Sequence, residues 1–112
     1  MAKGVTSLTA TIASSGTTSD TITVPSNKCL LGFRTPAAFT GTAVSFLMMH
    51  ESTDTAAPIY NAGTLLSETV ATNQAEFHPM NPQNFRGVRF VQVKINGTEG
   101  ASRSILLVFG EE

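Results

Sequence analysis

The stretch Ser7–Ala13, SLTATIA, alternates polar and apolar side chains residue by residue. Successive side chains of a β-strand point to opposite faces of its sheet, so this alternation predicts a strand with one buried and one solvated face. Asp20–Val24, DTITV, repeats the pattern a few residues later. Apolar repeats at helical spacing are almost absent from the rest of the chain, which predicts an all-β fold.

Turn residues divide the remaining sequence into short runs rich in β-branched and aromatic side chains, as strands require. Asn81–Phe85 differs, because Asn81 can cap and Pro82 can open one short helical turn. The predicted strands are Ser7–Ala13, Asp20–Val24, Cys29–Arg34, Thr42–His50, Ile59–Tyr60, Glu68–Ala71, Glu76–His78, Val88–Ile95 and Arg103–Phe109.

The chain has 112 residues, which is the size of one domain. Short strands at this density predict a single-domain β-sandwich, jelly-roll-like, over residues 7–112. Residues 1–6 carry no pattern and are predicted to be a flexible N-terminal arm. The side chains expected in the core are Phe33, Val44, Phe46, Val91, Val93, Leu106 and Val108.

Three predicted strands are apolar on both faces: Cys29–Phe33, Val44–Met49 and Ile105–Phe109. One face of each can fill the core of the sandwich, and the other face also needs cover from water. A domain of this size has little further chain to provide that cover. We therefore expect a second copy or a larger partner to bury part of an outer face.

Composition excludes several classes of protein. The net charge is -1 and 13% of the residues are charged, so binding of nucleic acid through bulk basic charge is excluded. No apolar run approaches the ~20 residues of a membrane span, and the first residues lack the apolar core of a secretory signal, so no membrane association is expected. Cys29 is the single cysteine, and at the start of an apolar strand it is expected to be a buried, inert thiol.

The residues that could carry catalysis or bind a metal lack the spacing that those functions need. His50, Glu51, Asp54 and His78 form no HxxxH or HExxH pattern, and no serine lies in a G-x-S-x-G turn. The glycines stand singly rather than in a phosphate-binding loop. We predict no catalytic centre, no metal and no cofactor, and we expect these four side chains not to converge on one point.

Two longer segments carry a resemblance to a known family. Leu31–Phe46 (LGFRTPAAFTGTAVSF) and Asn81–Lys94 (NPQNFRGVRFVQVK) resemble small proteins encoded among the head and structural genes of tailed bacteriophages. Those proteins share an LxGxxxPAAxTGTxLxF segment and an xPxxFxGxRYxKxRSG segment. The loops depart from the family: Glu51–Ala56 replaces its S-x-D-G-x-T-F turn, and Lys94–Thr98 replaces its RSGT turn.

The resemblance implies a structural protein of the virion, assembled in the host cytoplasm. It implies most directly a capsid decoration or cement protein on the outer capsid surface, with the major capsid protein or another virion protein as its partner. Self-association as a homotrimer is favoured, because such proteins usually meet the shell at threefold points. Two alternatives stay open: a tail, neck or fibre-attachment virion protein, and a carbohydrate-binding β-sandwich module. The second is weakened because the chain has no Trp and one Tyr.

A protein of this kind needs a surface that contacts the capsid. The unpatterned first residues could reach a neighbouring capsomer, and arginine can pair with carboxylates of the shell through its planar fork. The candidate capsid-contact residues are Met1, Ala2, Lys3, Gly4, Val5, Thr6, Arg86 and Arg89.

Overall fold

A computed structural model describes residues 4–51 and 53–111 of the chain. In that part no helix is long and apolar enough to cross a membrane. The described elements are β1 (Val5–Ile12), β2 (Ile22–Thr23), β3 (Cys29–Arg34), β4 (Ala43–Met49), β5 (Ala57–Pro58), β6 (Tyr60–Asn61), β7 (Thr64–Leu65), β8 (Ser67–Thr69), β9 (Phe77–Pro79), the 3₁₀ turn η1 (Pro82–Phe85), β10 (Phe90–Ile95) and β11 (Arg103–Gly110).

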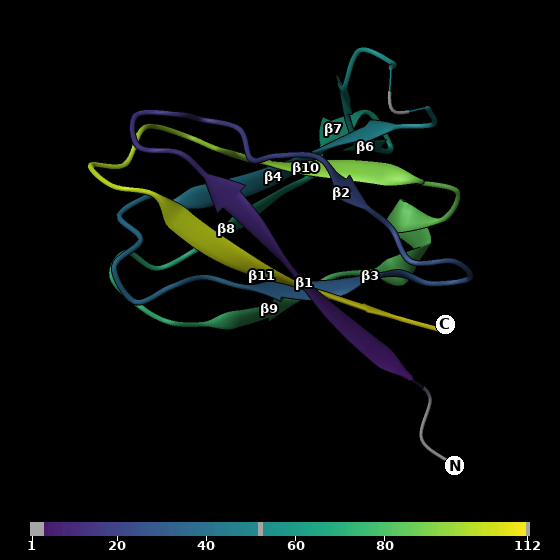
Figure 1. Cartoon of the computed structure of the whole chain (residues 1–112), viewed down its shortest axis with the longest axis horizontal. Helices are drawn as coiled ribbons and strands as arrows, with labels where there is room; N and C mark the ends of the chain where they lie inside the picture. Colours follow the sequence, from purple (N-terminus) through teal and green to yellow (C-terminus); the bar gives the residue numbers. More distant parts are fainter. Residues whose placement is uncertain (1–3, 52, 112) are drawn as a thin grey trace.

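Two antiparallel sheets pack face to face (Figure 1). The first sheet has the order β1-β11-β3-β9, and the second has the order β2-β10-β4-β5, with β8 also paired to β4. The chain passes from one sheet to the other at each step from β1 through β4 and again from β8 through β11. This alternation between two sheets is the jelly-roll arrangement, so the predicted fold class is confirmed. A separate hairpin, β6-β7, stands above the second sheet.

The predicted helical turn is confirmed, and several predicted strand bounds are corrected. Asn81 accepts a hydrogen bond from the Gln83 N–H at 3.1 Å and so caps η1, which begins at Pro82. β3 has the predicted bounds, whereas the second predicted strand shortens to the two residues of β2. β1 begins at Val5, two residues earlier than predicted, because that end of the strand pairs with Gly110.

Aromatic rings fill the centre of the core and join the two sheets. The Phe33 ring meets the Phe46 ring edge-on, with centroids 5.6 Å apart, and Phe46 meets Phe85 at 5.3 Å. Phe33 and Phe46 are fully buried, and Phe85 is nearly so. Of the residues predicted to form the core, Phe33, Val44, Phe46, Val91 and Val93 are buried.

Leu106 and Val108 were predicted to lie in the core, and that prediction is wrong. Both are half-buried on the outer face of β11, and the core side chains of this strand are Ile105, Leu107 and Phe109. The run ILLVF is apolar at every position, so its own pattern does not decide which face is buried. Pairing with β1 decides it, because the exposed Thr9 lies opposite Leu106.

The chain covers part of the outer face of the first sheet by itself. A Cβ atom added at Gly32 would meet the Phe77 ring, and one added at Gly110 would meet the Leu31 side chain at 2.6 Å. The two glycines therefore let these large side chains lie flat against the backbone of the sheet. Phe77 is nonetheless 50% exposed, so cover by the chain is incomplete.

Glu99 is a buried carboxylate that ties together the loops at one end of the sandwich. It is 3% exposed and accepts hydrogen bonds from the Thr40 N–H at 2.9 Å, the Thr40 hydroxyl at 2.8 Å and Arg103 Nε at 3.1 Å. Burial alone would raise the pKa of Glu99, but the bonds from Thr40 and the charge and bond of Arg103 outweigh it and hold that pKa below its usual value.

We predict that the free energy of unfolding falls as the pH drops into the acid range. A carboxyl group whose pKa is lowered in the folded state stabilises the protein above its unfolded pKa, and this contribution is lost as the pH falls through the folded pKa. Glu99→Gln removes the charge and should cost about 2 kcal/mol at neutral pH. In this variant, the free energy of unfolding measured by urea denaturation should fall less toward acid pH than it does in the parent protein. An equal fall in the variant and the parent protein would contradict this role of Glu99.

Gly32→Ala should destabilise the protein by about 1–3 kcal/mol, because overpacking strains a filled site. The new Cβ would lie 2.7 Å from the His78 carbonyl oxygen, which belongs to the backbone of the paired strand and cannot rotate away. Gly97→Ala is the matched control, since no atom lies within 4 Å of its added Cβ. Urea midpoints of the two variants should separate, and equal midpoints would refute the close packing at Gly32.

Candidate docking site

The segment from η1 to β10 presents two arginines from a fixed base. Phe85 anchors the turn in the core, and Arg86 follows it at the end of η1. Gly87 has φ 79°, the left-handed region that glycine adopts without strain, and it reverses the chain toward Arg89. The Arg89 carbonyl accepts a hydrogen bond from the Val24 N–H at 2.9 Å. Both arginine side chains are exposed, so they project from a backbone that is held in place.

A hollow of about 400 Å³ lies beside this corner. Residues 23–28 line one side of the hollow, and residues 87–90 line the other. Lys28 and Arg89 are among them, so two cations from segments far apart in sequence border one concave surface. The sequence interpretation did not single out Lys28, and no pattern around it signals this position.

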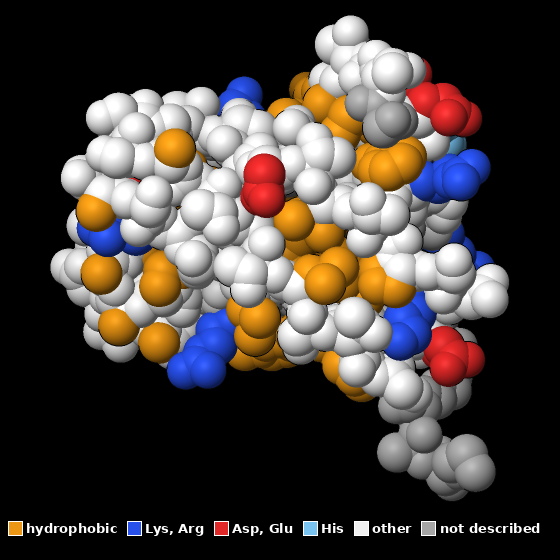
Figure 2. All heavy atoms as spheres, in the orientation of Figure 1, with side chains coloured by type: hydrophobic (Ala, Val, Ile, Leu, Met, Phe, Trp, Pro, Cys, Tyr) orange, Lys and Arg blue, Asp and Glu red, His pale blue; other side chains and the backbone are white. Residues whose placement is uncertain are grey.

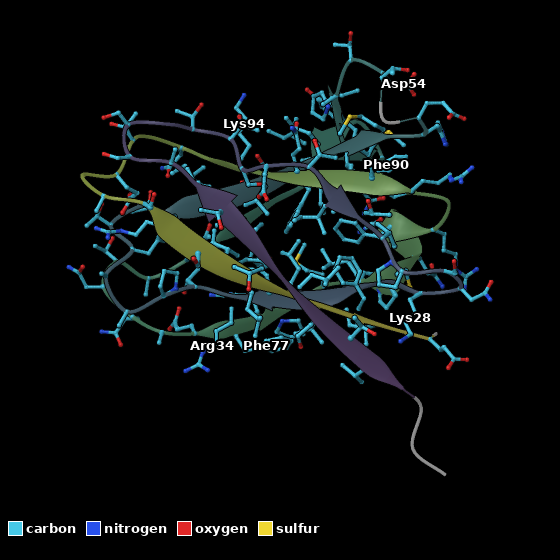
Figure 3. All side chains as sticks on the ribbon, in the orientation of Figure 1. Lys28, Arg34, Asp54, Phe77, Phe90 and Lys94 are labelled. Carbon is cyan, nitrogen blue, oxygen red and sulfur yellow. The ribbon has the colours of Figure 1, made fainter. Side chains whose placement is uncertain are left out.

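Lys28 also connects the hollow to the beginning of β1. Its Nζ donates a hydrogen bond to the Thr6 hydroxyl at 2.6 Å, and Figure 3 places Lys28 beside this strand. The two segments predicted to contact the capsid, at the N-terminus and at the arginines, therefore lie at the same end of the molecule. We call the surface formed by Lys28, Arg86 and Arg89 the basic end.

The predicted arm is shorter than residues 1–6. Val5 pairs with Gly110 and Thr6 with Phe109, so these two residues belong to the sheet. They could not be assigned from the sequence because the alternation becomes regular only from Ser7 onward. Gly4 precedes the strand and is exposed. Met1, Ala2 and Lys3 lie outside the described residues.

His50, Glu51 and Asp54 form a turn after β4. The Asp54 carboxylate accepts hydrogen bonds from the His50 N–H at 3.2 Å and from the Glu51 N–H at 2.9 Å. The Asp54 N–H in turn donates to the Glu51 carbonyl at 3.0 Å. Asp54 therefore uses one carboxylate oxygen to hold its own loop together.

His78 lies in the other sheet, on β9, and does not join that turn. Its ring stacks on Phe33, with centroids 5.1 Å apart. Nδ1 lies 3.4 Å from a Glu68 oxygen and Nε2 lies 3.2 Å from a Glu76 oxygen. Since Glu68 belongs to β8 in the second sheet, His78 connects the two sheets along one edge. Across residues 4–51 and 53–111, no group of three or more His, Cys, Asp and Glu side chains is placed to hold a metal ion.

Cys29 is buried, as predicted, at 6% exposure. Its Sγ lies 3.9 Å from the Gly110 carbonyl oxygen, within the pairing of β3 and β11. This position places the thiol inside the sheet framework.

The fold and this surface define a small antiparallel jelly roll with a basic end. No protein-family model matches the chain, and no curated protein matches it. Among solved structures, the chain is similar to a chain of the cyanophage Pam1 capsid asymmetric unit. The two are 19% identical, with a TM-score of 0.39, over 98% of this chain and 86% of that chain.

Proposed function

We propose that this protein is a bacteriophage capsid decoration or cement protein. It binds the outer surface of the assembled head through its basic end and stabilises the shell. It acts as a structural protein without catalysis, and it associates with copies of itself.

The observation that carries the proposal is where the two phage-like segments lie. Leu31–Phe46 forms most of β3, the following loop and most of β4, and Asn81–Lys94 forms η1 and most of β10. The two segments meet in the core, because Phe46 of the first contacts Phe85 of the second. The resemblance therefore falls on the framework that holds Arg86 and Arg89 in place.

The chemistry of the basic end suits an acidic protein surface. Each guanidinium offers several N–H donors in a planar fork that matches a carboxylate, and arginine is enriched where proteins dock on proteins. Lys28 adds a third cation at the border of the adjacent hollow. A partner with carboxylates on a convex ridge would fit this surface.

Stabilisation of a shell follows from mass action. A ligand that binds the assembled lattice and not the free subunits stabilises the lattice by its binding free energy. Many identical sites on one shell multiply a modest affinity per site. The protein therefore needs a surface that contacts the lattice, and we propose the basic end for this role.

The test measures binding of the protein to purified expanded heads of its phage. The double variant Arg86→Ala/Arg89→Ala should bind at least about tenfold more weakly, a loss of the size expected for interface arginines. Binding of the parent protein should also weaken as salt is raised, because exposed charges are screened. A deletion of residues 1–3 tests the arm without removing any residue of β1.

Arg34→Ala is the matched control. Arg34 is exposed and lies apart from Lys28 in Figure 3, and its removal changes the net charge by the same amount per residue. This variant should bind heads like the parent protein. If the double variant binds as tightly as the parent protein over a range of salt, the proposal of the basic end is refuted. If the deletion also binds as tightly, docking lies elsewhere.

A carbohydrate-binding module is the alternative from another class, and one residue bears on it. Tyr60, the single tyrosine, is 60% exposed on the β6-β7 hairpin and could stack on a sugar. A sugar platform usually combines several exposed aromatic rings. Saturable binding to glycans that is lost in Tyr60→Ala, without binding to heads, would favour this alternative over the decoration role.

A further inference from the structure

β1 differs from the other strands at the edges of the two sheets. It is eight residues long and pairs on one side only, with β11. The opposite edge of its sheet, β9, has three residues and contains Pro79, and β5 in the second sheet has two residues and contains Pro58. Short length and proline are the usual means by which proteins prevent unwanted pairing at an edge. β1 has neither, and it carries no charged side chain.

Contacts at Thr11 reveal which backbone groups of β1 point away from the sheet. The Thr11 N–H donates to the Asp20 carboxylate at 2.9 Å, and the Thr11 carbonyl accepts from the Asp20 N–H at 3.2 Å. Both groups of Thr11 therefore point away from β11. In an antiparallel pair this direction alternates with every residue, so Val5, Ser7 and Thr9 point the same way.

Asp20 satisfies the outward backbone groups of β1 at Thr11 but not those of the residues before it. Among residues 4–51 and 53–111, no backbone hydrogen bond satisfies the outward N–H and C=O groups of Val5, Ser7 and Thr9. Their side chains are exposed as well. Figure 1 shows β1 at the front of the molecule, with its first half extending beyond the body of the sandwich. We call these three residues, Val5, Ser7 and Thr9, the open window; Ser7 is at its centre.

The side of the sandwich next to this edge is also incompletely closed. β2, which lies beside β1, has only two residues. Leu8 and Val24 pack against the core there but remain partly exposed. Figure 2 shows hydrophobic side chains at the surface between these two strands. We call this strip of partly exposed apolar side chains, which includes Leu8 and Val24, the apolar seam. An added strand at β1 would cover it.

We propose that two copies of the chain pair through their β1 strands, antiparallel about a twofold axis at Ser7. Ser7 then faces Ser7 of the second copy, and Val5 faces Thr9 in both directions. Each of these pairs exchanges two hydrogen bonds, so the open window is satisfied in both copies at once. The first sheets of the two copies become one continuous sheet.

The occupant of this edge is a second copy because the window is complementary to itself. Its outward groups lie symmetrically around Ser7, and Asp20 ends the pairing at the same place in each copy. β1 itself has no charged side chain, so no like charges of the two strands face one another. Leu8 of each copy lies diagonal to Leu8 of the other, within the reach of long side chains, and shields the apolar seam. Twofold pairing also closes the assembly, because it consumes the long open edge that β1 presents among the described strands.

The test places charges on the twofold axis. Ser7→Lys and Ser7→Glu each set two like charges directly opposite one another, and each variant alone should weaken dimerisation at least about tenfold. An equimolar mixture of the two variants should recover the dimer as a mixed pair. Sedimentation equilibrium over a concentration series measures the association of each sample. Recovery in the mixture requires residue 7 to face residue 7.

Ser104→Lys is the matched control, because it adds the same charge to the same face of the sheet on β11. It should dimerise like the parent protein. Amide exchange supplies a second readout on the unmodified chain. The Val5, Ser7 and Thr9 amides should become protected as the concentration rises, while the Thr6, Leu8 and Ala10 amides, which face β11, should be protected throughout.

This inference deepens the self-association included in the proposed function, and it proposes a dimer where the resemblance implies a homotrimer. Its test uses no heads. Loss of head binding in the arginine variants therefore says nothing about β1, and a monomer in solution says nothing about the basic end. Three results would overturn the pairing. In the first, the parent protein stays monomeric and its Val5, Ser7 and Thr9 amides stay unprotected. In the second, Ser7→Lys leaves a dimer or trimer intact. In the third, the equimolar mixture of Ser7→Lys and Ser7→Glu does not re-associate.

Discussion

The packing of the two sheets and of β9 at one edge of the sandwich depends on the ring contacts of Phe33. Its buried ring meets Phe46 of the second sheet at 5.6 Å and stacks on His78 of β9 at 5.1 Å. Phe46 extends the contact to Phe85, which anchors η1. The spacing of the sheets, the position of β9 and the direction of the arginines after η1 are therefore set by one row of rings. Truncating Phe33 would cost about 3–5 kcal/mol, as removal of a core aromatic usually does.

The two ends and the edge of this jelly roll have different physical characters. A buried carboxylate, Glu99, fixes the loops at one end through hydrogen bonds. The basic end carries exposed cations on a rigid base, which suits binding to another protein. Within residues 4–51 and 53–111, the outward backbone groups of Val5, Ser7 and Thr9 have no backbone partner, and β1 has no charged side chain, which suits pairing with another strand. The two surfaces adjoin, because Lys28 of the basic end donates a hydrogen bond to Thr6 of β1.

The sequence predicted the parts of this fold in which local pattern and burial agree. Alternation in Ser7–Ala13 assigned the faces of β1, and the Asn81-Pro82 pair located η1. Ile105–Phe109 has no alternation, so its buried face depended on pairing with β1 and was predicted wrongly. Glu99 and Lys28 could not be recognised as important, because their partners Thr40 and Thr6 are distant in sequence. The candidate arginines were found from their residue type, and their shared location with Lys28 emerged only from the fold.

We propose that the protein covers the shell of a phage head, and its copy number in purified virions tests this role most directly. A decoration protein occupies sites repeated over the whole icosahedral shell, whereas a neck or tail component follows the symmetry of a single vertex. Quantitative gel analysis against the major capsid protein should give on the order of hundreds of copies per virion. A value of about six to twelve copies would contradict the account and place the protein in the neck or tail.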